Sequence, residues 1–249
     1  MKEFALANGL LPGEAITEDL WAKLVASSPD PVITDYKLAE SDLKGPFLKK
    51  LPSKLEDMKD LNSLGYSSPR EEIAERFHMS EALLVMLNPG KQFNKVGDTI
   101  SVANVLNRPA ALIGKIEVNK ALESVKAFDP NGGLVAYFPA SVGSEEKPTP
   151  TGTLKVVSSD ANPNYRYNPD YNFKGVKTKK PFDIMPGPNN PVGSYWIGLS
   201  AEGYGIHGTP NPGKVGKTES HGCVRLTNWD VAWLGKNIKK GTQVVFIDK

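Results

Sequence analysis

Residues 206–210 read Ile-His-Gly-Thr-Pro and residues 220–226 read Ser-His-Gly-Cys-Val-Arg-Leu. These segments contain the only cysteine of 249 residues, Cys223, and two of the three histidines, His207 and His221. A free thiol has a pKa of about 8.5 and needs a neighbouring base to act as a nucleophile near neutral pH. Twelve residues separate His207 from Ser220, enough for a loop to bring imidazole and sulfur together. Gly222 permits a tight backbone there, and amides near Cys223 are expected to face a developing oxyanion.

Two other interpretations of Cys223 have to be weighed. A lone cysteine is most often a small buried hydrophobe, but Ser, His, Gly and Arg around it are unusual for a core strand. Alternatively, His207, His221 and Cys223 could bind Zn²⁺ with an open fourth position. No acidic general base accompanies them in a recognisable pattern, so we expect neither a metal nor a cofactor.

The ordered pattern H-G-T-P followed by S-H-G-C-V-R-L is similar to the signature of the L,D-transpeptidases, also called the YkuD family, which remodel bacterial peptidoglycan. The resemblance implies that Cys223 attacks the carbonyl of the third residue of a tetrapeptide stem, from which the terminal D-Ala leaves. An amine then resolves the thioester, whereas water would give L,D-carboxypeptidase activity. It also implies that His207 is the base and that the carbonyl of Gly208 orients its imidazole.

Other residues of the motif are candidates for supporting roles. His221 stands two residues before Cys223, so on an extended segment both would project to the same face, which makes His221 a rival for the base. Arg225 continues this alternation and could clamp a substrate carboxylate. We expect Ser220 to support the loop by hydrogen bonding. Trp196 and Tyr204 either line the cleft or pack in the core.

Composition and charge exclude several classes of function. Hydrophobic residues make up 39% and charged residues 23% of the chain, as in globular proteins. A net charge of +2 is too small to indicate nucleic-acid binding. No apolar run approaches the roughly 20 residues of a membrane span, and the first ten residues lack the apolar core of a signal peptide. Because chemistry on the cell wall requires export, we expect a periplasmic or cell-wall-associated protein whose export signal is not present in this chain.

Before the motif-bearing region the sequence divides into three parts. Residues 1–27 predict a helix, a turn and a helix capped by Thr17, and resemble the second half of a small peptidoglycan-binding helical module. Residues 28–60, rich in Pro, Lys and Asp, predict a linker with one short strand at 32–34. Residues 61–107 predict two helices, capped by Ser68 and Ser80, and a strand, and are similar to a glycan-binding LysM module. The usual opening strand of that module is not evident there.

From residue 108 to residue 249 the pattern changes to short strands separated by Gly/Pro turns, with one late helix capped by Asn228. A hairpin is expected at 129–133, which reads Asp-Pro-Asn-Gly-Gly. We therefore predict a mainly β fold, an antiparallel β-sandwich that forms the L,D-transpeptidase catalytic domain. Residues 158–190 interrupt the strands and predict a lid or binding loop. Within it Tyr165, Tyr167, Tyr171 and Phe173 could cover a cleft, and a lysine run (Lys174, Lys177, Lys179, Lys180) could attract stem-peptide carboxylates or form a solvated face.

The expected partners follow from the family resemblance. They are peptidoglycan stem peptides and glycan, a wall-anchored protein as a possible acceptor, and carbapenem β-lactams as covalent inhibitors of Cys223. Three functions remain open at this point: a transpeptidase, a carboxypeptidase that trims tetrapeptides, and a wall-binding protein whose catalytic domain is inactive.

Overall fold

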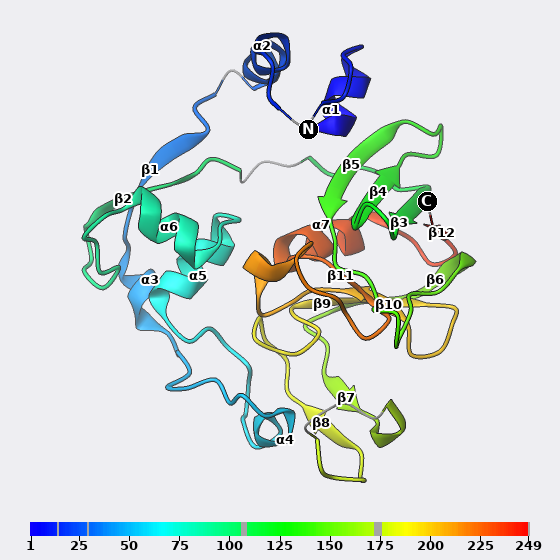
Figure 1. The fold of residues 1–249 in the computed structure, drawn as a ribbon. Helices are drawn as coiled ribbons and strands as arrows, with labels where there is room; N and C mark the ends of the chain where they lie inside the picture. The colour runs from blue at the N-terminus through cyan, green and yellow to red at the C-terminus, as the bar shows by residue number, and fades with distance from the viewer. Residues whose placement is uncertain (14, 29, 106–108, 172–175, 249) are drawn as a thin grey trace.

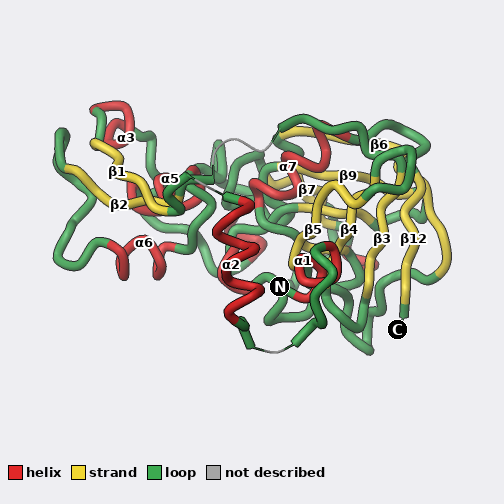
Figure 2. The backbone as a smooth tube through the Cα atoms, turned by 90° about the horizontal axis from the view of Figure 1, so that it is seen from above, coloured by secondary structure: helices red, strands yellow, loops and turns green. Residues whose placement is uncertain are grey.

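The structure is a computed structural model that describes residues 1–13, 15–28, 30–105, 109–171 and 176–248 (Figure 1). A β domain occupies the C-terminal half, and a smaller α+β unit lies to one side of it (Figure 2). None of the helices in these ranges is long and apolar enough to cross a membrane.

The β domain is built on one eight-stranded sheet in the order β11-β10-β9-β6-β12-β3-β4-β5. The prediction of a mainly β fold is confirmed, but the sheet is mixed, because β10 pairs with β11 and β3 with β12 in parallel. Its strands are β3 (Lys115–Asn119), β4 (Ser124–Phe128), β5 (Leu134–Pro139), β6 (Gly152–Ala161), β9 (Tyr195–Leu199), β10 (Gly205–His207), β11 (Val224–Arg225) and β12 (Gln243–Ile247).

The sheet curls until its two edges meet. Just after β5, Ser141 pairs with Arg225 of β11 in an isolated antiparallel bridge. The Ser141 amide donates to the Arg225 carbonyl at 2.9 Å, and the Arg225 amide donates back at 2.8 Å. The interior therefore lies inside one curled sheet, not between the two sheets of the sandwich that the sequence predicted.

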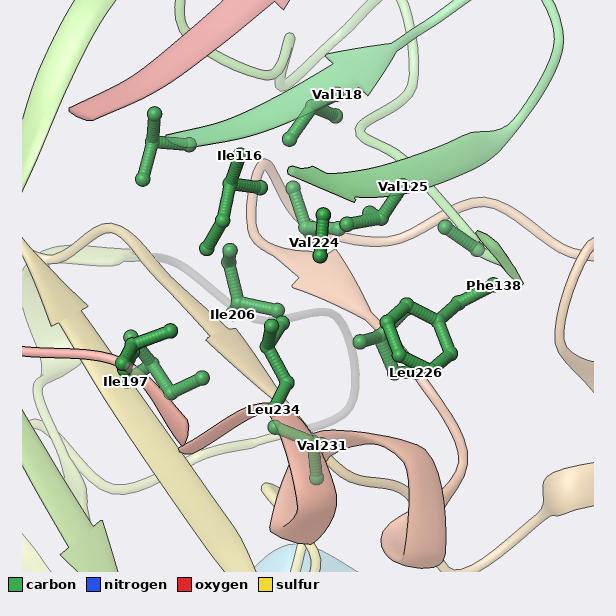
Figure 3. Packing of buried hydrophobic residues seen from close by; sticks show 14 of the residues in the cluster. Ile116, Val118, Val125, Phe138, Ile197, Ile206, Val224, Leu226, Val231 and Leu234 are labelled. Carbon is green, nitrogen blue, oxygen red and sulfur yellow. The ribbon is translucent and has the colours of Figure 1, made fainter. Parts of the chain in front are cut away.

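Helix α7 (Asn228–Asn237) packs its apolar face against this interior. Val231 and Leu234 point from α7 toward Ile197 and Ile206 of the sheet, and Leu226 lies beside Phe138 (Figure 3). The helix begins one residue earlier than predicted, because the side chain of Thr227, and not that of Asn228, accepts the hydrogen bond from Asp230 N.

The smaller unit, hereafter the small unit, consists of β1 (Ile33–Lys37), α3 (Glu40–Lys44), α5 (Pro69–Arg76), α6 (Glu81–Leu87) and β2 (Thr99–Ala103). Ser68 and Ser80 cap α5 and α6 as predicted. Strand β1 pairs antiparallel with β2 and closes over a core of Leu38, Ile73, Phe77, Leu84 and Ile100. Residues 33–44, expected to lie in a linker, pack with this unit, and the short strand predicted at 32–34 is seen as β1, which extends to Lys37.

The remaining helices attach the N-terminal segments to the β domain. Helices α1 (Lys2–Ala7) and α2 (Glu18–Ser27) lie near β4 and β5 (Figures 1 and 2), and Glu3 forms an ion pair with Lys126 of β4 at 2.7 Å. Thr17 caps α2 as predicted. The short helix α4 (Leu55–Met58) lies beside the insert after β6: Glu56 accepts from the Lys177 amide at 2.8 Å and from the Thr178 amide at 2.5 Å.

The insert predicted at 158–190 is more regular than its composition suggested. Strand β6 continues to Ala161, and β7 (Tyr165–Tyr167) pairs with β8 (Phe182–Ile184) as a separate two-stranded sheet. A 3₁₀ turn, η1 (Pro169–Tyr171), follows β7, and a second, η2 (Pro212–Lys214), lies in the loop after β10.

Candidate active site

Strand register places the key side chains on one face of the sheet. In the parallel β10–β11 pair, Ile206 is opposite Val224 and His207 is opposite Arg225. Ile206 and Val224 are buried in the core, and alternate residues of a strand point to opposite faces. His207 and Arg225 therefore face away from the core. They line, together with Cys223 just before β11, a cleft of about 1350 Å³.

The imidazole of His207 is buried and anchored by the next residue. Its Nδ1 lies 2.7 Å from the carbonyl oxygen of Gly208, the contact expected from the sequence. Because a carbonyl can only accept, Nδ1 carries the proton and Nε2 keeps a free lone pair. Burial and, second, the charge of Arg225 lower the pKa of His207 to about 4, against the opposing effect of the Gly208 hydrogen bond. At neutral pH the ring is therefore an uncharged proton acceptor.

Trp196 packs against one face of the His207 imidazole. It is the register partner of His207 across β9–β10, and the two rings stack with centroids 5.7 Å apart and planes inclined by 17°. Gly205 makes this possible, since a Cβ at that position would lie 2.5 Å from the indole. Trp196 also lines the cleft, so of the two roles left open, the cleft role fits the structure.

Cys223 is partly buried and lines the same cleft. Its thiol is directed at the carbonyl of Gly203, 3.6 Å away. Burial raises the pKa of the Cys223 thiol above its ordinary value, while a backbone hydrogen bond from Gly205 and the charge of Arg225 act in the opposite direction. The sulfur is therefore protonated at neutral pH, and it requires a base to become a thiolate.

The loop before Cys223 is tied by Ser220. The Ser220 hydroxyl donates to the Cys223 carbonyl and accepts from the Gly222 amide at 3.2 Å, which is the supporting role expected for it. The Gly222 amide is thus bonded within the loop, and we do not assign it to an oxyanion hole. Gly222 has φ +104°, and a Cβ there would lie 3.0 Å from the ring of Tyr204, which lines the cleft.

The backbone bend at Gly222 affects the direction in which His221 projects relative to Cys223. Strand β11 begins only at Val224, and the left-handed backbone of Gly222 interrupts the chain between His221 and Cys223. The two side chains therefore do not sit on one continuous extended segment. His221 is exposed and lines the cleft. The structure therefore removes the geometric reason for treating His221 as a rival of His207, which is buried and anchored.

Arg225 carries a positive charge into the cleft. Its Nη1 reaches the carbonyl of Glu219 at 3.5 Å, and its backbone closes the sheet with Ser141. Burial lowers the pKa of Arg225, an effect that Cys223 opposes. An arginine keeps its charge at neutral pH despite such a shift, so it remains available to a carboxylate.

The far walls of the cleft include residues that the sequence did not single out. The segment before and within α4 contributes Lys54, Leu55 and Met58, and the loop after β5 contributes Glu146 and Lys147. They were missed because the first segment has linker composition and the second has no motif. Only the tertiary fold places these residues in the cleft that Cys223 also lines.

The insert also forms part of the cleft wall, although not with all the predicted side chains. Tyr165, Arg166 and Asp170 line the cleft. Tyr167 instead is buried and stacks on Phe182, its register partner in the β7–β8 pair, with ring centroids 4.7 Å apart. The Tyr171 side chain and the whole of Phe173 and Lys174 lie outside the described part of the chain, whereas Lys177, Lys179 and Lys180 are exposed.

Comparison with known proteins adds independent findings. Residues 114–246 match the family model described as the L,D-transpeptidase catalytic domain, YkuD. The chain is 30% identical over 176 residues to the putative L,D-transpeptidase YkuD of Bacillus licheniformis, covering 70% of this chain and 90% of that protein. It is 30% identical over 192 residues to the probable L,D-transpeptidase YbiS of Escherichia coli, covering 74% of this chain and 62% of that protein.

Among solved structures, L,D-transpeptidase 3 from Mycobacterium tuberculosis with a faropenem-derived adduct is similar at 17% identity and a TM-score of 0.45. The similarity covers 61% of this chain and 75% of that one. Among the described residues, no three His, Cys, Asp or Glu side chains are grouped as metal ligands would be.

Proposed function

The chain belongs to the L,D-transpeptidase family, and from this we propose that it is a cysteine-dependent acyltransferase that acts on peptidoglycan stem peptides through a thioester. The observation that carries the proposal is the register of β10 and β11, which places His207 and Arg225 on the cleft face beside Cys223. A wall-binding protein with an inactive domain would not need a free thiol and an anchored neutral imidazole in one cleft.

In the first half-reaction, His207 Nε2 takes the proton of the Cys223 thiol as the sulfur attacks the carbonyl carbon of the third stem residue. The tetrahedral adduct then collapses, and the C–N bond to the terminal D-Ala breaks. The leaving amine takes the proton back from the imidazolium. The products are free D-Ala, a thioester on Cys223 and a neutral His207.

In the second half-reaction, the amino group of an acceptor stem attacks the thioester carbonyl. His207 removes a proton from the attacking amine and returns it to the departing Cys223 sulfur, so that thiol and imidazole regain their starting states. Attack by water in place of the amine would release a tripeptide, which is the carboxypeptidase alternative.

The protonation states fit a neutral pair better than a preformed ion pair. The pKa of Cys223 is raised and that of His207 is lowered to about 4, so proton transfer has to accompany attack. A preformed thiolate–imidazolium pair would require the opposite shifts. The Gly208 carbonyl would stabilise the transient imidazolium, in the way that the aspartate of a catalytic triad does.

The charges of the cleft suit a stem peptide, which carries both carboxylates and an amine. Arg225 can hold a substrate carboxylate near the sulfur. Carboxylates on other walls, including Glu146, Asp160 and Asp170, can receive the amine of a diamino acid. Both the donor and the acceptor of the reaction can therefore be bound in this cleft.

Other partners follow from the same chemistry. A nucleophilic thiol that forms a thioester with a stem peptide would also open a strained β-lactam, so we include carbapenems as covalent inhibitors at Cys223. Glycan binding by the small unit and a wall-anchored protein acceptor belong to the proposal as well. Peptidoglycan lies outside the cytoplasmic membrane, so the proposed substrate requires an exported protein, periplasmic or cell-wall-associated.

Product analysis tests this function. Purified disaccharide-tetrapeptide is incubated with the protein and with Cys223→Ala, and the products are identified by mass spectrometry. We expect dimers joined through two third-position residues, present with the wild type and absent with the variant. Tripeptide alone would establish the carboxypeptidase alternative, and the absence of any Cys223-dependent product would overturn the proposal.

A further inference from the structure

A buried polar junction joins the small unit to the β domain. Two glutamates of α5 meet two asparagines of the β domain, and all four side chains are buried. Asn189 Nδ2 donates to Glu71 Oε1 at 2.8 Å. Asn228 Nδ2 donates to Glu75 Oε2 at 2.9 Å and is 3.2 Å from Oε1. The two Asn–Glu pairs are similar, but the remaining hydrogen bonds of the two asparagines go to different parts of the molecule.

The oxygen end of Asn228 reaches the segment that directly follows the proposed base on β10. Its Oδ1 accepts from the Thr209 amide at 3.1 Å and from the Ser194 amide at 3.1 Å. Glycines flank this oxygen so closely that a Cβ at Gly208 would lie 2.2 Å from it, and a Cβ at Gly193 2.1 Å. A side chain at Gly193 or at Gly208 would therefore collide with this oxygen.

A continuous set of contacts therefore connects the small unit to the imidazole. Glu75, together with the Pro188 carbonyl at 3.1 Å, holds the nitrogen end of Asn228, and the oxygen end of Asn228 holds the Thr209 amide. The Thr209 amide is part of the peptide bond whose carbonyl, that of Gly208, accepts from His207 Nδ1. Fixing this peptide plane fixes the direction of that carbonyl, since the amide and carbonyl of one peptide unit are coplanar.

We propose that Asn228 and Glu75 are positioning residues for His207, so that docking of the small unit helps to set the orientation of the base. The inference rests on the proposed role of His207 in acyl transfer. It adds that a residue outside the β domain, Glu75, takes part in organising the active site.

The second pair at the junction provides a contrast. Besides Glu71, the Asn189 carboxamide donates to the Gly65 carbonyl at 2.9 Å, and the Asn189 amide donates to the Leu64 carbonyl at 2.9 Å. These contacts stay within the junction and do not reach Thr209. Loss of Asn189 therefore loosens the same interface without releasing the peptide that anchors His207.

The state of Glu75 supports a role beyond packing. Burial raises the pKa of Glu75 to about 7, with the nearby charge of Glu71 acting in the same direction and the Asn228 hydrogen bond opposing it. Burial and, second, the negative charges of Glu75, Glu72 and Glu71 raise the pKa of Tyr66. A buried acid with this shift destabilises the fold when ionised, so an apolar side chain would serve better if packing were the only requirement.

The test compares four variants in the full chain: Glu75→Ala, Glu75→Gln, Asn228→Ala and the control Asn189→Ala. The ring nitrogens of ¹⁵N-labelled histidine report directly on His207, whose signals are assigned by their loss in His207→Gln. We expect the Nδ1–H signature of His207 to change in Glu75→Ala and Asn228→Ala. It should persist in Glu75→Gln, which keeps an acceptor for Asn228, and in Asn189→Ala.

Kinetics on disaccharide-tetrapeptide supply the second measurement. A misplaced base affects the chemical step, so kcat should fall by up to about a hundredfold in Asn228→Ala and less in Glu75→Ala, with KM nearly unchanged. Asn189→Ala should keep kcat even where its melting temperature is lowered. If Asn228→Ala does not fold, the inference is tested by Glu75→Ala and Glu75→Gln alone, of which only Glu75→Ala should change the His207 signal and lower kcat.

Two results would overturn the inference. One is a wild-type His207 spectrum and wild-type kcat in folded Glu75→Ala. The other is an equal effect of Asn189→Ala, which would mean that the junction acts only through general stability. Failure of the proposed function is distinguishable, because a wild-type protein inert toward tetrapeptide would leave the NMR comparison intact.

Discussion

His207 and Arg225 are register partners in the parallel β10–β11 pair, and the charge of Arg225 acts on the buried imidazole. Burial and this charge hold the pKa of His207 at about 4. The cation proposed to bind substrate therefore also adds to the effect of burial in lowering the pKa of the base. A protonated His207 could not accept the proton of Cys223, so both functions of Arg225 serve the same step.

Replacing Arg225 should raise the pKa of His207. In Arg225→Met the repulsive charge is gone but burial persists, so we expect a value above about 4 that stays below the ordinary 6.5. An NMR titration of the His207 ring measures it. Arg166→Met, which removes another cation that lines the cleft, is the control and should leave the titration unchanged. An unchanged or lowered value in Arg225→Met would contradict the electrostatic explanation.

Loss of the Ser220 hydroxyl should loosen the loop that presents the thiol. Ser220→Ala leaves the Gly222 amide and the Cys223 carbonyl without their partner. We expect destabilisation of about 1–3 kcal/mol and a lower rate of acyl transfer, measured by urea unfolding and product formation. Thr218→Ala is the matched control, since the exposed Thr218 hydroxyl donates to the nearby Lys214 carbonyl at 3.3 Å. Equal stability and activity of the two variants would argue against the role of Ser220.

The parts that were predictable from sequence are those encoded within a few residues. The caps at Thr17, Ser68 and Ser80 are local hydrogen bonds. The hairpin at 129–133 is equally local, because Asp129 accepts from the Asn131 amide at 2.8 Å and from the Gly133 amide at 2.9 Å. The His207–Gly208 contact joins adjacent residues and was expected for the same reason.

Features that depend on distant partners were not predictable. The sequence predicts a short strand at 32–34, but its pairing with residues 99–103 has no local signal, and its surroundings have the composition of a linker. The parallel register of β10 and β11 has no sequence signal, although it determines which side chains face the cleft. Asn228 looked like a helix cap because such residues favour that position, yet its carboxamide serves Thr209 and Glu75 while Thr227 caps the helix.

Gly205→Ala should disturb the stack of Trp196 on His207. A Cβ at Gly205 would lie 2.5 Å from the indole, so the ring has to move off the imidazole. Overpacking of this kind costs about 1–3 kcal/mol, and we expect a lower melting temperature together with altered Trp fluorescence and slower acyl transfer. Gly13→Ala, where the nearest atom is 3.9 Å away, should have no such effect. A Gly205→Ala protein with wild-type properties would show that the stack is unimportant.

Glu75→Gln should change how stability depends on pH. The folded-state pKa of Glu75 is raised from 4.5 to about 7, so between these values the folded protein holds a proton that the unfolded chain has lost. Stability is therefore expected to fall as pH rises through this window and to level off above it. At about 1.4 kcal/mol for each pKa unit, the loss amounts to roughly 3 kcal/mol.

The variant lacks this titration, so its free energy of unfolding should exceed that of the wild type at pH 8 and approach it near pH 4.5. Urea unfolding of both proteins across this pH range gives the difference between their free energies of unfolding. Groups that titrate equally in both proteins do not contribute to this difference. A difference that does not vary with pH would contradict the shifted pKa of Glu75.

The role of Cys223 as nucleophile is tested most directly by trapping the acyl-enzyme. The protein is mixed with disaccharide-tetrapeptide, quenched with acid within a turnover, and examined by intact-mass and peptide-mapping mass spectrometry. We expect a mass increase equal to the disaccharide-tetrapeptide minus D-Ala, located on the peptide that contains Cys223 and absent from Cys223→Ala. Product formation by Cys223→Ala, or an adduct on another residue, would contradict the assignment.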